Sequence, residues 1–461
     1  MYIFYDFETS DKDFLGQILS YCFILTDENY QTISELNGLI KPNRTELPSV
    51  GAILTNKLNI NHLMENGSTE FDAATNIYQF LESATNEYGA IPLVGFNSAR
   101  FDFKHFEKLL LKYGLSPTFY GKLGSLDILQ FARYCAVSAP NSFPFTKKER
   151  DSTPYYSFKL EDLSAAFDCL DAPQTHDARD DVLLTIELLK KLEANCDQSL
   201  QTFQKQQKNT SNFELNSTIL IESSLAFEQI SDTPTIKNTR WLVIGKAAKT
   251  TFILVNLDAY AESTKADFND YQLLTRYLNL RTTFFHCTDT EPLSDTSILA
   301  DQNIKRISMS ALQYFKLFPV DWDIEYRPWA MGFNNINTLR SSILKLADDP
   351  SSYQTIIKEL IAYRNQDSKQ EEINMMIQLF NRFYLNYHPN PKHLDRYIQP
   401  RYIKKTLYRN SEDAICPMIQ AKELANLINV DETSALDKEN LIALQNYQKS
   451  FMNHISELKP S

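Results

Sequence analysis

The chain has 461 residues, 43% of them hydrophobic and 12% aromatic, which predicts two to four domains with real hydrophobic cores. Its net charge of −12 argues against a surface built for nonspecific binding to duplex DNA, but is compatible with a local basic groove. No apolar run approaches the ~18 residues needed to span a bilayer, no Cys-x-x-Cys pair is present, and the N-terminus lacks a signal-like segment. We therefore expect a cytoplasmic protein without a zinc ribbon or dithiol centre.

The first predicted element is a strand at residues 2–9, a short stretch rich in aromatic residues. Because successive strand side chains alternate, Asp6 and Glu8 point to the same face. Two adjacent carboxylates repel each other, so burying them requires a cation. Oxygen ligands suit a hard divalent ion such as Mg²⁺ or Mn²⁺. The alternative interpretation is an exposed strand end with two solvated acids.

Further strands and helices follow with short connections. Strands are predicted at 17–26, 31–40 and 91–97, helices at 71–81 and 103–113, a strand–helix unit from 125 and a helix from 157. Asp102 falls where a strand meets a helix, so it is either a ligand group at a sheet edge or the N-cap of the helix. Asp127 precedes an apolar helix, which favours a structural cap over a role in a site.

A second acidic pattern begins at His176 and leads into an apolar helix at 182–192. Asp177 is the better candidate to cap this helix, and Asp180 can be a solvated neighbour. Asp181 opens the apolar run and should face inward, where an acid needs a partner. A metal ion held by Asp6 would provide one. A lone histidine is more often structural, but His176 lies only five residues before Asp181.

These motifs, taken together in chain order, resemble the 3′→5′ exonuclease superfamily with four acidic ligands and a histidine, and within it the exodeoxyribonuclease I family. The residues that carry the resemblance lie at 4–9, 17, 48–55, 95–102, 157–160 and 176–181. The resemblance implies an RNase H-like α/β exonuclease domain at 1–195 with a mixed central sheet. It further implies an SH3-like α+β domain at 196–340 and a helical C-terminal domain at 341–461.

The resemblance also implies a set of site residues. The metal-binding acids are Asp6, Glu8, Asp102 and Asp181, holding two Mg²⁺ ions that Mn²⁺ can replace, and His176 is the general base. We also assign substrate contacts to Phe7, Thr9, Asn97 and Phe101. Two metals about 3.5–4 Å apart can activate a water and stabilise the leaving oxygen, and a neutral imidazole can accept the proton of the water.

The chain after residue 195 carries weaker patterns. Residues 196–217 are polar and are interpreted as a linker or exposed connection. Strands are predicted at 241–244, 251–258 and 282–287, with a helix at 271–280 between the last two. The C-terminal part is predicted to be helical at 339–346, 353–363, 373–383, 421–428 and 438–458.

One C-terminal stretch is basic in an otherwise acidic chain. It runs from Arg382 to Arg409 and combines seven cations with interleaved tyrosines. Cations and stacking rings are what single-stranded nucleic acid requires, so we assign substrate contacts to Arg396, Arg401, Lys404 and Lys405. The alternative is a solvated helix face whose tyrosines are partly in the core.

The function expected from the resemblance is degradation of single-stranded DNA to 5′-mononucleotides by a monomeric enzyme of DNA repair and recombination. The expected partners are single-stranded DNA and the acidic C-terminal tail of single-strand DNA-binding protein. Two alternatives are a 3′→5′ exoribonuclease on the same fold, because the acids do not sense the sugar, and a catalytically vestigial strand-binding adaptor. The adaptor predicts gaps in the acid set, and the sequence has none.

Overall fold

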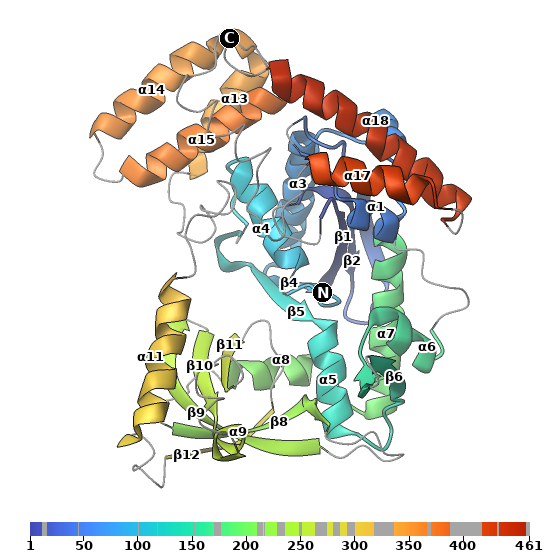
Figure 1. Cartoon of the computed structure of the whole chain (residues 1–461), viewed down its shortest axis with the longest axis vertical. Coiled ribbons are helices and arrows are strands. Elements are labelled where there is room, and N and C mark those ends of the chain that lie inside the picture. The colour runs from blue at the N-terminus through green and yellow to red at the C-terminus, as the bar shows by residue number, and fades with distance from the viewer. Residues whose placement is uncertain are drawn as a thin grey trace.

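The computed structural model describes most of the chain (Figure 1). The residues outside the description are 12–15, 45, 100, 118, 151–152, 170–176, 210–214, 216, 228–235, 249–250, 263–273, 280–285, 293–299, 318–335, 367–369, 388–416, 431–432 and 458–461. His176 lies among them, as do Arg396, Arg401, Lys404 and Lys405. None of the described helices is long and apolar enough to cross a membrane.

A five-stranded mixed sheet organises the N-terminal part. Its strands are β1 (Tyr2–Thr9), β2 (Ile18–Thr26), β3 (Thr32–Leu39), β4 (Ile91–Gly95) and β5 (Leu123–Asp127), in the order β3-β2-β1-β4-β5. The first three strands form an antiparallel meander, and β4 and β5 extend the sheet in parallel with β1. The predicted meander is confirmed, and β1 lies in the middle of the sheet.

Helices cover both faces of this sheet (Figure 1). They are α1 (Val50–Asn56), α2 (Ile60–Asn66), α3 (Glu70–Tyr88), α4 (Asp102–Lys112), α5 (Ile128–Ser138), α6 (Leu160–Ala166), α7 (Ala178–Cys196) and α8 (Leu200–Asn209), with a 3-10 turn η1 (Phe119–Gly121) and a hairpin of β6 (Thr146–Arg150) and β7 (Thr153–Ser157). Alternation along β1 sends Ile3, Tyr5 and Phe7 into the core under α3 and α4. Tyr2 and Phe4 face α5 and α7 on the other side. Asp6 and Glu8 therefore belong to the face that α7 covers.

The second sheet is antiparallel and forms the SH3-like part. Its strands are β8 (Ser217–Phe227), β9 (Ile236–Ala248), β10 (Thr251–Asn256), β11 (Thr275–Asn279) and β12 (His286–Pro292), in the order β11-β10-β9-β8-β12, with helices α9 (Leu257–Glu262) and α11 (Gln302–Leu317). The strands predicted at 241–244 and 251–256 are confirmed and pair as the β9–β10 hairpin, whereas 257–258, predicted as the end of the second strand, begin α9. The helix predicted at 271–280 is wrong for 275–279, which pair with β10 as a strand.

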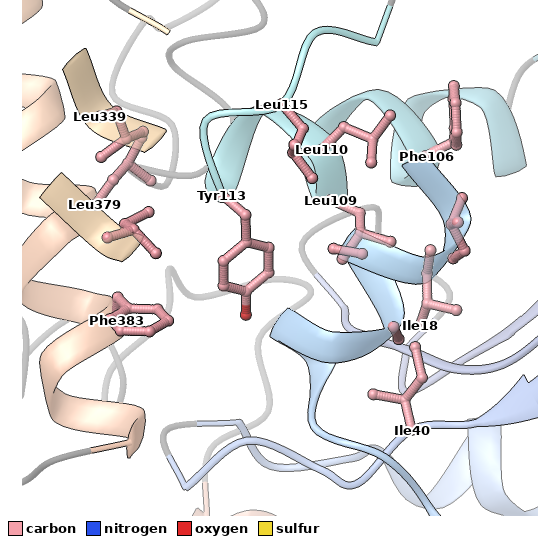
Figure 2. Packing of buried hydrophobic residues seen from close by; sticks show 14 of the residues in the cluster. Ile18, Ile40, Phe106, Leu109, Leu110, Tyr113, Leu115, Leu339, Leu379 and Phe383 are labelled. Carbon is pink, nitrogen blue, oxygen red and sulfur yellow. The ribbon is translucent and has the colours of Figure 1, made fainter. Parts of the chain in front are cut away.

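The C-terminal part is helical, as predicted. Its elements are α13 (Ile336–Asp348), the 3-10 turn η3 (Pro350–Ser352), α14 (Tyr353–Gln366), α15 (Gln370–Tyr387), α17 (Pro417–Ile428) and α18 (Ala435–Glu457). All of these helices except α17 share one core cluster with the first sheet, where Leu379 and Phe383 pack near Tyr113 at the end of α4 (Figure 2). In Figure 1 they lie at the end of the molecule opposite the second sheet.

Two segments do not follow the predicted divisions. Residues 200–209 were interpreted as an exposed connection, but they form α8, whose Leu200 and Phe203 are buried against α5. The apolar spacing of Leu200 and Phe203 decides this, although their neighbours are polar. Helix α8 therefore packs with the first sheet. Helix α13 begins before the predicted boundary at 340, but it packs with the C-terminal helices.

Candidate active site

The acids of β1 lie side by side on the sheet face that α7 covers. Asp6 pairs with Cys22 and Glu8 with Ser20 across the β1–β2 ladder. Glu8 is 9% exposed and Asp6 is partly exposed. The expectation of an exposed strand end with two solvated acids is therefore wrong, because central position in the sheet buries one acid and half-buries the other.

A third carboxylate comes from the first turn of α7. Asp177 caps this helix, because its side chain accepts hydrogen bonds from the backbone N–H groups of Arg179 and Asp180, as predicted. Asp181 follows one turn inside and is 7% exposed. One ligand oxygen from each of Asp6, Glu8 and Asp181 lies within 4.8 Å of the others. Two elements separated by some 170 residues of sequence thus build one carboxylate cluster.

An ion pair fixes this end of α7 to the edge of the sheet. Arg179 donates from Nε to Glu35 Oε1 over 2.6 Å and from its second amino group to Glu35 Oε2 over 3.2 Å, the fork geometry of a bidentate pair. Asn37 supports Glu35 from the next position on the same face of β3. The sequence gives no signal for this pair, since its partners are 144 residues apart.

Asp102 is the fourth acid and is 5% exposed. Phe101 occupies the N-cap position and Asp102 is the first residue of α4, so the N-cap interpretation of Asp102 is wrong. The Phe7 backbone N–H donates a hydrogen bond to the Asp102 carboxyl group. This bond joins the start of α4 to β1 beyond the last β1–β4 pair, and it brings Asp102 into electrostatic contact with Asp6 and Glu8.

Burial and the neighbouring acids raise the pKa values of three of the acids, Asp6, Glu8 and Asp102. Burial raises the pKa of Glu8 to about 9, and the carboxylates of Asp181 and Asp102 add to the effect. Burial also raises the pKa of Asp102 to about 8, against the two backbone N–H groups that lower it. The pKa of Asp6 lies well above its ordinary value for the same reasons, burial first and then its acidic neighbours. A site that buries several like charges is completed by a cation.

Asp127 holds the turn that leads to Asp102. Its Oδ1 accepts hydrogen bonds from the N–H groups of Asn97 and Leu129 over 2.9 and 3.0 Å, and its Oδ2 accepts one from Ala99 over 3.2 Å. Asn97 has a left-handed backbone with φ of 56°, so this turn needs such support. The predicted cap on α5 is confirmed, and the same carboxylate also fixes the turn between β4 and α4.

Replacing Asp127 with Ala should lower the free energy of unfolding by about 3 kcal/mol, because three backbone N–H groups in or near the core lose their acceptor. Urea unfolding measures this change. The matched control is Asp177→Ala, which removes an exposed cap and should cost only about 1 kcal/mol. Equal losses in the two variants would contradict the role assigned to Asp127.

The residues assigned to substrate contacts differ in their surroundings. Phe7 is 4% exposed and packs against Tyr5 and Phe23, which favours a place in the core. Thr9 is buried and its hydroxyl donates to the Asp11 carbonyl over 2.8 Å. Phe101 is half-buried beside the acids, and Asn97 is exposed on the turn before them. Only Asn97 and Phe101 thus present surface at the acid end of the sheet.

The start of the basic C-terminal stretch is structural. Arg382 is 3% exposed and forms a buried ion pair with Glu46 at 2.8 Å. Tyr384 stacks on Tyr353 with ring centroids 3.9 Å apart, and Tyr387 bonds to the hydroxyl of Tyr113. For these residues the nucleic-acid interpretation is wrong, because partners distant in sequence bury them. The assigned cations at 396–405 lie outside the described residues.

The sheet order and the acids at the end of its central strand place the chain in the RNase H-like class of α/β folds. No protein-family model matches the sequence. A curated exodeoxyribonuclease I of Buchnera aphidicola (subspecies Acyrthosiphon pisum) is 27% identical over 194 residues, which are 41% of this chain and 45% of that protein. The match therefore spans less than half the length of this relative.

Solved structures of exonuclease I have the same fold over nearly the whole chain. Escherichia coli exonuclease I in complex with a dT13 oligonucleotide gives a TM-score of 0.66 at 17% identity, covering 98% of this chain and 99% of that one. The zinc-bound form of the E. coli enzyme with single-stranded DNA gives 0.65 at 17% identity and the same coverage. An exonuclease I–SSB-Ct complex gives 0.62 at 17% identity, covering 100% and 99%. The chain has the exonuclease I fold, and its predicted resemblance to the exodeoxyribonuclease I family is confirmed.

Proposed function

We propose that the protein is a metal-dependent 3′→5′ exonuclease that releases 5′-mononucleotides from single-stranded DNA. The observation that carries this proposal is the cluster of Asp6, Glu8 and Asp181, whose ligand oxygens lie within 4.8 Å of one another. The exonuclease I fold supports it over the whole chain, and the N-terminal sequence similarity supports it over the part that contains the acids.

The donor set fits hard divalent cations. Carboxylate oxygens are what Mg²⁺ and Mn²⁺ prefer. Burial first, and acidic neighbours in addition, raise the pKa values of Glu8 and Asp102, and a bound cation would offset both effects. We assign the four acids Asp6, Glu8, Asp102 and Asp181 to hold two Mg²⁺ ions. When bound, the ions supply charge neutralisation at the phosphate and activation of water.

The protein groups have separate tasks. Asp6 would contribute to holding both ions, and Glu8 would help to hold only the ion that activates the water. His176 is assigned as the general base, since a neutral imidazole accepts a proton near pH 7. In the sequence His176 directly precedes Asp177, the N-cap of α7. Phe101 and Asn97 are assigned to the terminal nucleotide.

Metal stoichiometry tests the division between the two β1 acids. Glu8→Ala should bind one Mn²⁺ ion fewer than the native protein, whereas Asp6→Ala should bind none, because only Asp6 is shared. Isothermal titration with Mn²⁺, or electron paramagnetic resonance of the bound ion, counts the sites. The same residual stoichiometry in both variants would argue against a bridging Asp6.

Digestion of end-labelled strands tests the reaction itself. With Mg²⁺, a 5′-labelled single strand should shorten progressively from its 3′ end and a blunt duplex should resist. An RNA strand of the same sequence should be cleaved more slowly than DNA under this proposal and faster if the protein is an exoribonuclease. The acids do not decide this preference, because it depends on contacts with the 2′-hydroxyl. Strand binding without any cleavage would instead indicate an adaptor, a role that the complete acid set disfavours.

The proposed protein partner is the acidic C-terminal tail of single-strand DNA-binding protein. The solved exonuclease I–SSB-Ct complex has the same fold as this chain, which supports this choice. An acidic tail would dock on a basic surface. Fluorescence anisotropy of a labelled tail peptide, with and without added salt, measures the interaction.

A further inference from the structure

Residues 43–56 form a connection between the end of β1 and the C-terminal helices. We call them the bridging segment; they comprise the loop after β3 and the helix α1, and residue 45 within them lies outside the description. In Figure 1, α1 lies between β1 and the pair α17–α18. Each side of the bridging segment makes hydrogen bonds to one of these neighbours.

On the catalytic side, the bridging segment holds the residues that follow Glu8. Ser49 N–H donates to the Ser10 carbonyl over 2.8 Å. Asn56, at the end of α1, donates from Nδ2 to the Thr9 carbonyl over 2.9 Å. The carbonyl groups of Thr9 and Ser10, just beyond Glu8, are therefore bonded to this segment.

Gln17 adds a second connection on the same side. Its Oε1 accepts from the Asn43 N–H over 2.8 Å, and its own N–H donates to Ser10 Oγ over 2.7 Å. The Ser10 N–H donates back to the Gln17 carbonyl over 2.8 Å. Gln17 is 2% exposed and Ser10 is 2% exposed, so these bonds are shielded from water. They fix the start of β2 relative to the end of β1.

On the other side, the C-terminal helices contact the bridging segment through hydrogen bonds and one ion pair. Tyr447 of α18 donates its hydroxyl to the carbonyls of Asn43 and Glu46 over 2.9 and 3.1 Å. Gln420 of α17 donates from Nε2 to the Pro48 carbonyl over 3.0 Å. Arg382 of α15 pairs with Glu46, both side chains being 3% exposed. Backbone groups that have no strand or helix partner find theirs in these side chains.

The interior of the junction is also ordered. Glu70 Oε2 accepts from Asn43 Nδ2, Lys112 Nζ and the Tyr113 hydroxyl over 2.5, 2.6 and 2.6 Å. The hydroxyl of Tyr387, from α15, contacts Asn43 Oδ1 over 3.3 Å. An apolar cluster closes the gap around these groups, with members from β2, α1, α2, α17 and α18: Leu19, Val50, Ile53, Ile60, Leu63, Leu424, Leu441 and Leu444. Hydrogen bonds and apolar packing thus join the C-terminal helices to the bridging segment.

We infer that the C-terminal helices α15, α17 and α18 position the end of β1, and with it Glu8, through the bridging segment. Tyr447 and Gln420 are the positioning residues at the helix side, and Gln17 and Asn56 are those at the strand side. In this role the helices act on the chemical step of the proposed nuclease, independently of any contact that they make with a nucleic-acid strand. The inference rests on the proposed function for the role of Glu8.

The test uses the full chain with the double substitution Tyr447→Phe and Gln420→Leu, which removes two donor groups and the three hydrogen bonds that they make to the bridging segment, and leaves every acid in place. Two substrates are compared with Mg²⁺: a long single DNA strand, and the p-nitrophenyl ester of thymidine 5′-monophosphate, which contains a single nucleotide and no strand. We expect kcat to fall on the order of 10-fold on both substrates, since a lost hydrogen bond of about 1.4 kcal/mol corresponds to a factor of ten. The KM for the long strand should stay unchanged.

The matched control breaks a contact that α18 makes just outside the bridging segment. Asp437→Asn removes the ion pair of α18 with Lys57 at the end of α1, 2.7 Å long and outside the buried junction. It should leave both kcat values unchanged. A fall in activity on the long strand alone, through a raised KM, would overturn the inference and assign the helices to strand binding only.

A second measurement does not depend on activity. Hydrogen exchange of the Ser10, Gln17, Asn43 and Ser49 amides reports the bonds on the strand side directly. Their protection should fall on the order of 10-fold in the double variant and stay native in Asp437→Asn. Native protection at all four amides would overturn the inference. If the native chain were inactive on both substrates, the proposed function would fail. The amide exchange rates would still show whether the C-terminal helices order the end of β1. Tyr447→Phe alone serves if the double variant does not fold.

Discussion

Replacing Asp181 or Asp6 with Ala will abolish the Mg²⁺-dependent release of nucleotides while the protein remains folded. Both residues contribute to the same carboxylate cluster, and a metal ion stabilises the transition state of phosphodiester cleavage by several kcal/mol. The expected loss in kcat is therefore at least ~10³-fold, at 1.36 kcal/mol for each factor of ten. Timed release of mononucleotides from a labelled single strand measures it, with circular dichroism as the check on folding.

The matched control for this prediction is Asp180→Ala. Asp180 precedes Asp181 in the same helical turn, carries the same charge and is exposed, so its removal should leave kcat within a factor of about two. His176→Ala should give a third pattern, with most of the rate lost and Mn²⁺ binding retained, because a base is not a ligand. Native rates in Asp6→Ala or Asp181→Ala would refute the metal assignment.

The stability of the metal-free protein should fall as the pH rises from 6 to 9. Glu8 has a pKa of about 9 in the folded protein against 4.5 when exposed, and the pKa of Asp102 rises from 3.8 to about 8. Between these values the folded state binds more protons than the unfolded state, so raising the pH favours unfolding. The slope is about 1.4 kcal/mol per pH unit for each proton. Thermal unfolding in EDTA should show Tm falling by several degrees across this window.

Mg²⁺ should reverse this dependence. The ion binds the deprotonated carboxylates, so its stabilising effect grows as the pH rises. Glu8→Gln should flatten the metal-free curve and raise Tm at pH 8, because the variant no longer buries an ionisable group there. Glu82→Gln removes a carboxylate from the exposed side of α3 and should leave the curve as it is. A pH-independent Tm in EDTA would contradict the electrostatics described for the cluster.

The regular elements that the sequence predicted well are those with a strong periodic pattern. The alternation in β1 and the helical spacing in α4, α7 and α18 correspond to faces that are buried in the fold. The pattern failed at 275–279, where apolar residues at mixed spacing satisfy a strand as well as a helix. Pairing with β10 decided between them, and this pairing is a long-range contact that no local window contains.

The basic C-terminal stretch shows a different limit. Arg382, Tyr384 and Tyr387 have the residue types of a nucleic-acid surface, and their sequence neighbourhood supports that interpretation. The partners of Arg382 and Tyr387 are Glu46 and Tyr113, which lie 336 and 274 residues away in the sequence, and Tyr384 stacks on Tyr353 of the preceding helix; burial against these partners makes all three structural. Residue type indicates what a side chain can bind, and tertiary contacts determine what it does bind.

The sequence by itself determined that Asp6 and Glu8 share one face, because strand alternation is local. It also determined that Asp177 caps the helix that carries Asp181, since capping involves only the next few residues. Only the tertiary structure decided that α7 crosses the face of β1 that bears the acids, that Phe7 N–H binds Asp102, and that Asp127 supports the turn between them. These contacts depend on how helices pack over the central strand, and packing is set by the whole core and not by any one segment.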